Sequence, residues 1–127
     1  MKHPELLIPG AGPDEAVGRL RRIIELLRGE GGCPWDRAQT HDSLRSCLIE
    51  EAYEVDEAIE EQDPSHLEEE LGDVLLQVIF HSDLGKEAGE FDLATVANRE
   101  CEKMIRRHPH VFSNFEAHSI DTVLEKW

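Results

Sequence analysis

The sequence is short of basic residues. Lysine and arginine together number 13, against 28 aspartates and glutamates, which gives the 127 residues a formal net charge of -15. Such a charge repels polyanions, so it excludes binding to nucleic acid or to an anionic membrane through bulk electrostatics. A polyanionic substrate would have to arrive with a metal ion and meet a local group of cations.

Long apolar runs and disulfide patterns are also missing. No segment is apolar enough for a membrane span, and Met1-Lys2-His3-Pro4 does not begin a secretory signal. The three cysteines, Cys33, Cys47 and Cys101, give no even framework, and neither Cys33 nor His41 has the paired ligands of a zinc site. We therefore expect reduced cysteines and a cytoplasmic protein.

The spacing of apolar residues is helical, and no convincing strand, repeat or low-complexity segment is present. The length allows one domain with a modest core. We expect a flexible tail over 1–12 and a single all-α domain over 13–127. Helices are expected over 13–28, 42–61, 64–87 and 92–107, with a final helical turn over 122–127. Because the sequence stops on the large apolar residue Trp127, we expect a further helix or a second domain to follow.

The first of the two central helices, 42–61, carries a carboxylate where a core side chain is expected. At about 100° per residue, Glu51 lies in the middle of the apolar stripe, Glu54 lies at its edge and Glu50 lies just outside it. A buried carboxylate without a partner is costly or takes up a proton. Glu51 therefore needs a compensating partner.

The second central helix, 64–87, repeats this feature. Its residues 71–80 are apolar on most sides, yet Glu70, Asp73 and Gln77 form a polar stripe at i, i+3 and i+7. A single hairpin partner cannot cover an apolar surface that surrounds the helix. We therefore expect a second subunit to bury part of it.

The connection over 62–64 is short, which predicts that the two central helices are antiparallel neighbours, with Asp63 as the N-cap of the second. Counting outward from Asp63 puts Glu54 and Asp73 level with each other. We predict a four-carboxylate cluster, held together by a cation, that consists of Glu51, Glu54, Glu70 and Asp73. The alternative is ordinary surface glutamate in an acidic chain, which the position of Glu51 and Asp73 on apolar faces disfavours.

Two further segments allow two interpretations each. In the segment over 33–42, Trp35 either plugs the fold or lies at the rim of the site, and Thr40 or Asp42 caps the next helix. The helix over 92–107 ends in three cations at i, i+3 and i+4, which suit either the helix dipole or phosphate recognition. These three cations are Lys103, Arg106 and Arg107.

Five blocks of sequence carry a resemblance to a known family. They lie at 33–36 (Cys-Pro-Trp-Asp), 39–41, 48–54, 69–78 and 106–112. Together they resemble the MazG family of nucleoside triphosphate pyrophosphohydrolases over about residues 13–127. The residues that meet the family's Glu-Glu-x-x-Glu and Glu-x-x-Asp signature are Glu50, Glu51, Glu54, Glu70 and Asp73.

The resemblance implies an all-α enzyme, usually a homodimer or a larger assembly. Such an enzyme uses Mg²⁺ to hydrolyse an NTP or dNTP to the monophosphate and pyrophosphate, in house-cleaning or nucleotide-pool control. The implied metal ligands are Glu51, Glu54, Glu70 and Asp73, with Glu50 in support. The residues implied to lie at the nucleotide are Lys103, Arg106, Arg107 and Trp127. Family members often carry two such domains in tandem, whereas this sequence has one.

The residue types agree with that chemistry. Carboxylate oxygens suit hard Mg²⁺, with Mn²⁺ as an alternative, and both ions also bind phosphate. A carboxylate not committed to the metal could accept the proton of the attacking water, and the candidates are Glu50 and Glu54. Two other classes stay open: a non-catalytic metal-binding assembly module, and a di-iron bundle. A di-iron bundle requires a Glu-x-x-His motif on two helices. In this sequence the residues three positions after Glu51 and Glu70 are Glu54 and Asp73, and neither is a histidine.

Overall fold

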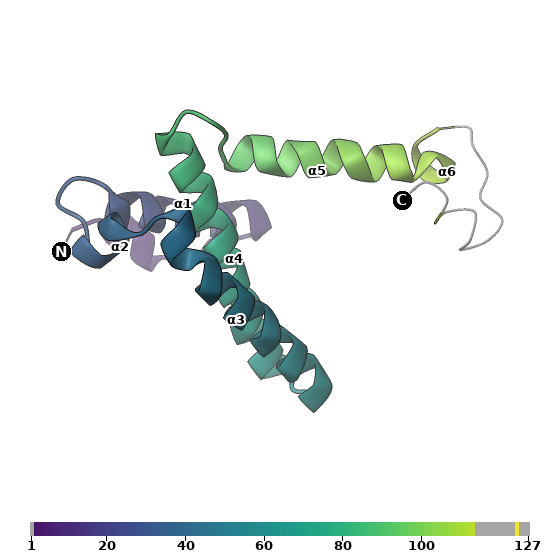
Figure 1. The fold of residues 1–127 in the computed structure, drawn as a ribbon, viewed down its shortest axis with the longest axis horizontal. Helices are drawn as coiled ribbons and strands as arrows, with labels where there is room; N and C mark the ends of the chain where they lie inside the picture. The colour runs from purple at the N-terminus through teal and green to yellow at the C-terminus, as the bar shows by residue number, and fades with distance from the viewer. Residues whose placement is uncertain (1, 114–123, 125–127) are drawn as a thin grey trace. The chain divides into compact units, whose positions relative to one another are not determined.

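The computed structural model describes residues 2–113 and 124, and all the regular structure in this part of the chain is helical (Figure 1). The all-α prediction is confirmed. No helix within the described residues is long and apolar enough to cross a membrane. The chain divides into two compact units, Met1–Glu90 and Phe91–Trp127.

The first unit contains the central hairpin. Its elements are the 3₁₀ helix η1 (Pro4–Leu7) and the helices α1 (Pro13–Arg28), α2 (Pro34–Ala38), α3 (His41–Glu61) and α4 (Pro64–Glu87). The second unit contains α5 (Leu93–Arg107) and α6 (Pro109–Phe112). The four expected helices agree with α1, α3, α4 and α5 to within one residue at each end. Helix α2 was not expected, and the predicted final turn over 122–127 lies almost wholly outside the described residues.

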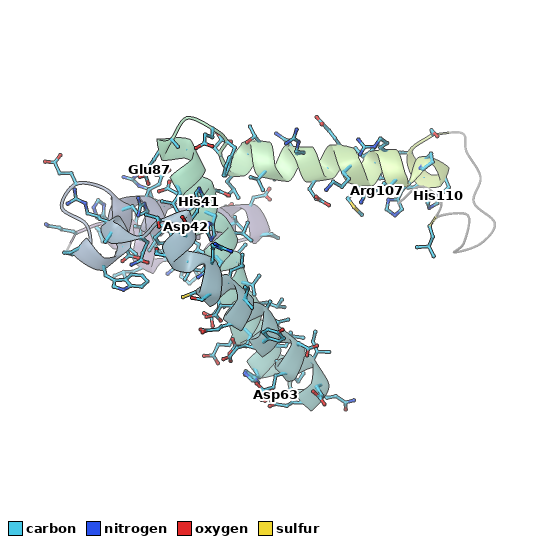
Figure 2. The ribbon with its side chains drawn as sticks, in the orientation of Figure 1. His41, Asp42, Asp63, Glu87, Arg107 and His110 are labelled. Atoms are coloured by element: carbon cyan, nitrogen blue, oxygen red, sulfur yellow. The ribbon has the colours of Figure 1, made fainter. Side chains whose placement is uncertain are left out.

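The start of α3 is fixed by a capping box. Thr40 Oγ1 accepts a hydrogen bond from the Ser43 amide at 3.1 Å, and Ser43 Oγ accepts one from the Thr40 amide at 2.8 Å. Thr40 is therefore the cap, and Asp42 is not. Beside this cap lies His41, which Figure 2 labels. Its Nδ1 is 2.7 Å from His81 Nδ1 on α4, which ties the beginning of α3 to its partner helix.

The tip of the hairpin is a two-residue reversal. Gln62 ends α3 in the left-handed conformation, with φ of 57°. Asp63 Oδ1 then accepts hydrogen bonds from the amides of Ser65 and His66, at 3.1 and 3.3 Å, and so caps α4. Figure 2 labels Asp63 at this tip. The prediction that Asp63 is the N-cap is confirmed, and the tight reversal places α3 and α4 antiparallel.

The core of the first unit lies where α3 and α4 pack together and where α1 packs on α4. Its buried apolar side chains are Ile24, Leu44, Ala58, Ile79 and Phe80. Other large apolar side chains of the hairpin are at least half exposed in the single chain, namely Ile49, Tyr53, Ile59 and Leu71. The core therefore uses only part of the hairpin's apolar surface.

Arg28 joins three elements of this unit. Its Nε and Nη2 atoms donate to the two carboxylate oxygens of Glu87 on α4, at 2.7 and 2.9 Å. Its Nη1 atom donates to the carbonyl oxygens of Asp36 and Gln39, so it also holds α2 and the residues after it. Trp35 of α2 points into solvent, with 61% of its surface exposed, so the prediction that it plugs the fold of the single chain is wrong.

We expect Arg28→Met to lower the free energy of unfolding by about 2 kcal/mol, because it removes hydrogen bonds to a carboxylate and to two loop carbonyls. The Arg28 side chain is 9% exposed, so water replaces these bonds poorly. Arg22→Met is the matched control, since Arg22 is half exposed and pairs along its own helix with Glu25. Urea titration should give a change within about 0.5 kcal/mol for this control. Equal losses in both variants would contradict the assigned role of Arg28.

The N-terminal tail contacts α1 through Arg19 Nε, which donates to the carbonyl oxygen of Leu6 at 2.7 Å, and through the Ala11 amide, which donates to Glu15 Oε2 at 3.1 Å. In the second unit, α5 begins with a capping box between Asp92 and Thr95. It ends at His108, whose Nδ1 lies 2.7 Å from the carbonyl oxygen of Met104. Asp92 is therefore the N-cap of α5.

Candidate metal centre

Three carboxylates meet in the middle of the α3–α4 hairpin. Oxygens of Glu51, Glu70 and Asp73 all lie within 4.8 Å of one another. Glu70 is buried, with 7% of its surface exposed, and the other two are half-buried. The helical wheel had placed Glu51 within an apolar stripe, and its partial burial confirms that prediction.

Glu54 joins the cluster through Glu70. A second group of ligand atoms within 4.8 Å of one another consists of Glu54, His66 and Glu70. The other three predicted carboxylates thus each place an oxygen within 4.8 Å of one on Glu70, although Asp73 is grouped with Glu51 rather than with Glu54. Glu54 and Glu50 are both exposed, as their positions at and beyond the edge of the stripe predicted.

The crowding of negative charge helps to raise the pKa of two of these side chains. Burial, reinforced by the charges of Asp73, Glu70 and Glu54, raises the pKa of Glu51. Burial and the charges of Glu54 and Asp73 likewise raise the pKa of Glu70, against an opposing effect of His66. Both carboxylates therefore hold a proton more readily than an isolated glutamate, as expected of a cluster that needs a cation.

His66 is the residue of this site that sequence reasoning missed. Its Nδ1 lies 3.0 Å from Glu61 Oε2, and its Nε2 lies 3.3 Å from Glu70 Oε1. These two carboxylates raise the pKa of His66, the hydrogen bond with Glu61 contributing most. The spacing of His66 four residues before Glu70 could have indicated a shared helix face.

Gln77 continues the polar stripe of α4 one turn beyond Asp73. It is buried, as the stripe predicted, and its Oε1 has no hydrogen-bond partner among the described residues. The interior of the hairpin is therefore polar from the carboxylates to this amide, in a position that an apolar core would normally fill.

The cluster fits a hard divalent cation. Its donors are carboxylate oxygens, which Mg²⁺ prefers and Mn²⁺ accepts. A cation would offset the repulsion that raises the pKa of Glu51 and Glu70. The single imidazole, on His66, lies at the tip side of the cluster and adds one nitrogen donor.

The three cations predicted to meet phosphate belong to the second unit, on α5. Lys103 Nζ lies 3.5 Å from Glu100, one turn earlier on the same helix, and Arg106 is exposed. Lys103 and Arg107 are half-buried. Their role stays a prediction, as does that of Trp127, which lies outside the described residues.

We expect Mg²⁺ to raise the melting temperature by about 3 °C or more at pH 7.5 and by less at pH 5. A raised carboxyl pKa means that the folded chain binds more protons than the unfolded chain, so stability falls as pH rises from about 4.5 through the folded pKa. Metal should cancel this loss at pH 7.5, whereas protons already cancel part of it at pH 5. Calorimetry with MgCl₂ or with NaCl at equal ionic strength measures the difference, and an equal midpoint in the two salts at pH 7.5 would count against a preformed cluster.

Comparison with known proteins relates this geometry to a family. Residues 39–112 match the family model of the MazG nucleotide pyrophosphohydrolase domain. The chain is 53% identical over 97 residues to the nucleoside triphosphate pyrophosphohydrolase/pyrophosphatase MazG of Thermotoga maritima, covering 76% of this chain and 38% of that protein. It is 41% identical over 112 residues to the nucleoside triphosphate pyrophosphohydrolase of Escherichia coli K12, covering 87% of this chain and 43% of that one. The chain thus spans less than half the length of these two relatives.

A solved structure shares the fold. The crystal structure of a mazG-related protein from Thermotoga maritima superposes with a TM-score of 0.70 at 30% identity. The likeness covers 87% of this chain and 94% of that one. The matched family segment, 39–112, contains α3 and α4 in full, and with them every residue of the carboxylate cluster.

Proposed function

We propose, since this chain belongs to the MazG family of nucleotide pyrophosphohydrolase domains, that it hydrolyses nucleoside or deoxynucleoside triphosphates to the monophosphate and pyrophosphate. The observation that carries the proposal is the meeting of Glu51, Glu70 and Asp73 within 4.8 Å inside a helical hairpin. Bringing these carboxylates together costs free energy, because they repel one another and are partly buried, and a bound cation would offset that cost. Mg²⁺ is the cation that accompanies nucleoside triphosphates.

The four carboxylates would hold the metal, namely Glu51, Glu54, Glu70 and Asp73. Mg²⁺, or Mn²⁺ in its place, supplies charge that polarises the phosphoryl oxygens and makes water more acidic. Glu70, which is the most buried of the four, belongs to both groups of ligand atoms and so fixes the centre of the site.

A carboxylate near the metal would accept the proton of the attacking water. Glu50 and Glu54 are the candidates, because both are exposed on α3 beside the cluster. Glu54 would serve as base only if it were not fully committed to the metal. Glu50 lies outside both groups of ligand atoms, which leaves its carboxylate oxygens available for a proton.

The phosphate chain would be bound by Lys103, Arg106 and Arg107, whose charges offset the negative charge that develops on the leaving pyrophosphate. By the family resemblance, Trp127 would lie close to the nucleotide. The field of a chain with a net charge of -15 repels a free triphosphate, so these cations would matter most at short range.

Assembly would complete the domain. We propose a homodimer or larger homo-oligomer, because the hairpin leaves Ile49, Tyr53, Ile59 and Leu71 at least half exposed in the single chain. The compartment proposed is the cytoplasm, which agrees with three free cysteines. The role proposed is house-cleaning or control of the nucleotide pool.

The experiment that tests the function is pyrophosphate release from a panel of NTPs and dNTPs, with Mg²⁺ and with EDTA. Metal-dependent release is the expected result. A non-catalytic assembly module would bind metal without releasing pyrophosphate, and a di-iron bundle would bind iron and leave nucleotides intact. Either of those results would replace the proposed function.

A further inference from the structure

His66 lies between two carboxylates at the tip side of the hairpin. Its Nδ1 is 3.0 Å from Glu61 Oε2, and its Nε2 is 3.3 Å from Glu70 Oε1. Glu54 on the facing helix completes a group whose ligand atoms lie within 4.8 Å of one another. The tip itself is marked by Asp63 in Figure 2, where Asp63 Oδ1 caps α4 and the side chain also groups with Glu61 and His66 within 4.8 Å.

The contact with Glu61 determines which nitrogen of His66 faces the cluster as an acceptor. An ionised carboxylate only accepts hydrogen bonds, so Nδ1 must carry the proton that is donated to Glu61. In the neutral ring Nε2 then has a lone pair, and this lone pair faces the oxygens of Glu70 and Glu54. Three electron-rich atoms facing one another are stable only when a proton or a metal ion lies among them.

This arrangement is the one that supports a metal-binding histidine. A ligating imidazole usually donates its other N–H to a carboxylate, which fixes both the tautomer and the orientation of the ring. Glu61 takes that place here. We propose that Glu54, His66 and Glu70 form a second metal position, which shares Glu70 with the Glu51–Glu70–Asp73 group and prefers Mn²⁺, Co²⁺ or Zn²⁺ to Mg²⁺.

The preference follows from the donor atoms. Mg²⁺ favours oxygen ligands almost exclusively, whereas Mn²⁺, Co²⁺ and Zn²⁺ also accept imidazole nitrogen. The inference rests on the proposed function in one respect, which is that Mg²⁺ binds the Glu51–Glu70–Asp73 group. The two positions would then differ in chemistry although they share one carboxylate.

The distances agree with a shared ion. Two donors that each lie about 2.1 Å from one metal are roughly 3–3.5 Å apart, and His66 Nε2 and Glu70 Oε1 are separated by 3.3 Å. Glu70 is buried and His66 is held by Glu61, so these two ligands are already in place. Glu54 is exposed, and rotation of its side chain alone would close the group.

The test uses Mn²⁺ alone with the full chain near pH 8, and pulsed electron paramagnetic resonance to detect coupling to ¹⁴N. Wild-type protein should show histidine nitrogen coupled to Mn²⁺, and His66→Gln should lose it. His66→Gln should also weaken Mn²⁺ binding by about ten-fold or more, while Mg²⁺ binding, measured by calorimetry, changes less than about three-fold. His3→Gln, in the exposed N-terminal tail, is the matched control and should leave both properties unchanged.

A second variant keeps the histidine in place. Glu61→Gln removes the carboxylate that orients His66, and it should weaken Mn²⁺ binding about ten-fold while the nitrogen coupling survives at saturating metal. Glu61 is exposed, so this change does not disturb the core. The proposal would be overturned if Glu61→Gln and His66→Gln both bound Mn²⁺ with the wild-type affinity.

Two results would overturn it directly. Absence of ¹⁴N coupling in wild-type protein at saturating Mn²⁺ would mean that a proton, and not a metal, lies between His66 and Glu70. Persistence of the coupling in His66→Gln would assign it to another histidine. Pyrophosphate release with Mg²⁺, measured on the same preparations, separates this inference from the proposed function: release without nitrogen coupling removes only the second position, and coupling without release removes only the enzymatic activity.

Discussion

Glu51→Gln and Asp73→Asn should each lower metal-dependent pyrophosphate release by about 10³-fold or more, while the protein stays folded. Each substitution keeps the shape of the side chain and removes one charge from the proposed metal site. The pKa of Glu51 is raised by burial and by the charge of Asp73, so loss of either charge also relieves repulsion in the protein without metal. The melting temperature in EDTA should therefore be unchanged or higher.

Glu57→Gln is the matched control for this pair. Glu57 lies on the same helix as Glu51, is exposed, and belongs to neither group of ligand atoms. Its replacement should leave kcat/KM within about two-fold of the wild-type value, because an exposed side chain outside the groups of ligand atoms contributes little. Near-normal turnover by Glu51→Gln or Asp73→Asn, at any Mg²⁺ concentration, would remove the metal-site assignment.

Lys103→Ala, Arg106→Ala and Arg107→Ala should each lower kcat/KM by about 10- to 100-fold with little effect on stability. A charge-assisted hydrogen bond to phosphate is worth about 1.5–3 kcal/mol. Its loss would weaken binding of the substrate and of the leaving pyrophosphate, and it would leave the free energy of unfolding nearly unchanged. If these residues only complemented the helix dipole, the loss would instead be about 0.3–1 kcal/mol of stability, with catalysis intact.

Arg22→Ala provides the control for these three variants. Arg22 forms an i,i+3 pair with Glu25 on α1, just as Lys103 pairs with Glu100 on α5. Steady-state kinetics and urea titration on all four variants separate the two roles. If Lys103→Ala and Arg106→Ala both turn over normally, the phosphates are bound elsewhere, and Arg37 and Arg45 are the next residues to replace.

The hairpin and most of its cluster could be predicted from the sequence because local rules decide them. The 3.6-residue period places Glu51 among apolar neighbours and aligns Glu70 with Asp73. Asp63 followed by proline fixes where one helix ends and the next begins. Two antiparallel helices joined by so short a connection have little choice of register, so their carboxylates meet.

The rest depends on contacts that no local pattern records. Gln62 takes a left-handed conformation that glycine usually supplies, and this reversal brings Glu61 of one helix to His66 of the next. Arg28 pairs with Glu87 across 59 residues of sequence. Neither spacing is distinctive in a chain with 28 acidic residues. The sequence therefore does not predict which carboxylate His66 or Arg28 contacts, and only the folded structure does.

The segment before α3 shows the same limit. No helix was expected there, yet Pro34–Ala38 forms a short helix, because proline is favourable at the first helical position and Arg28 binds the carbonyl oxygen of Asp36. Trp35, an apolar residue that sequence reasoning could bury, is carried to the surface by this helix. The other interpretation, that Trp35 lies at the rim of the site, stays a prediction.

The proposed reaction is cleavage of a nucleoside triphosphate between the α and β phosphates at the carboxylate cluster. ³¹P nuclear magnetic resonance of one NTP, incubated with Mg²⁺ and either wild-type protein or Asp73→Asn, tests it most directly. We predict that the wild-type protein yields the resonances of monophosphate and pyrophosphate in equal amounts, and that Asp73→Asn yields neither. Formation of diphosphate and orthophosphate, or equal turnover by the two proteins, would contradict the claim.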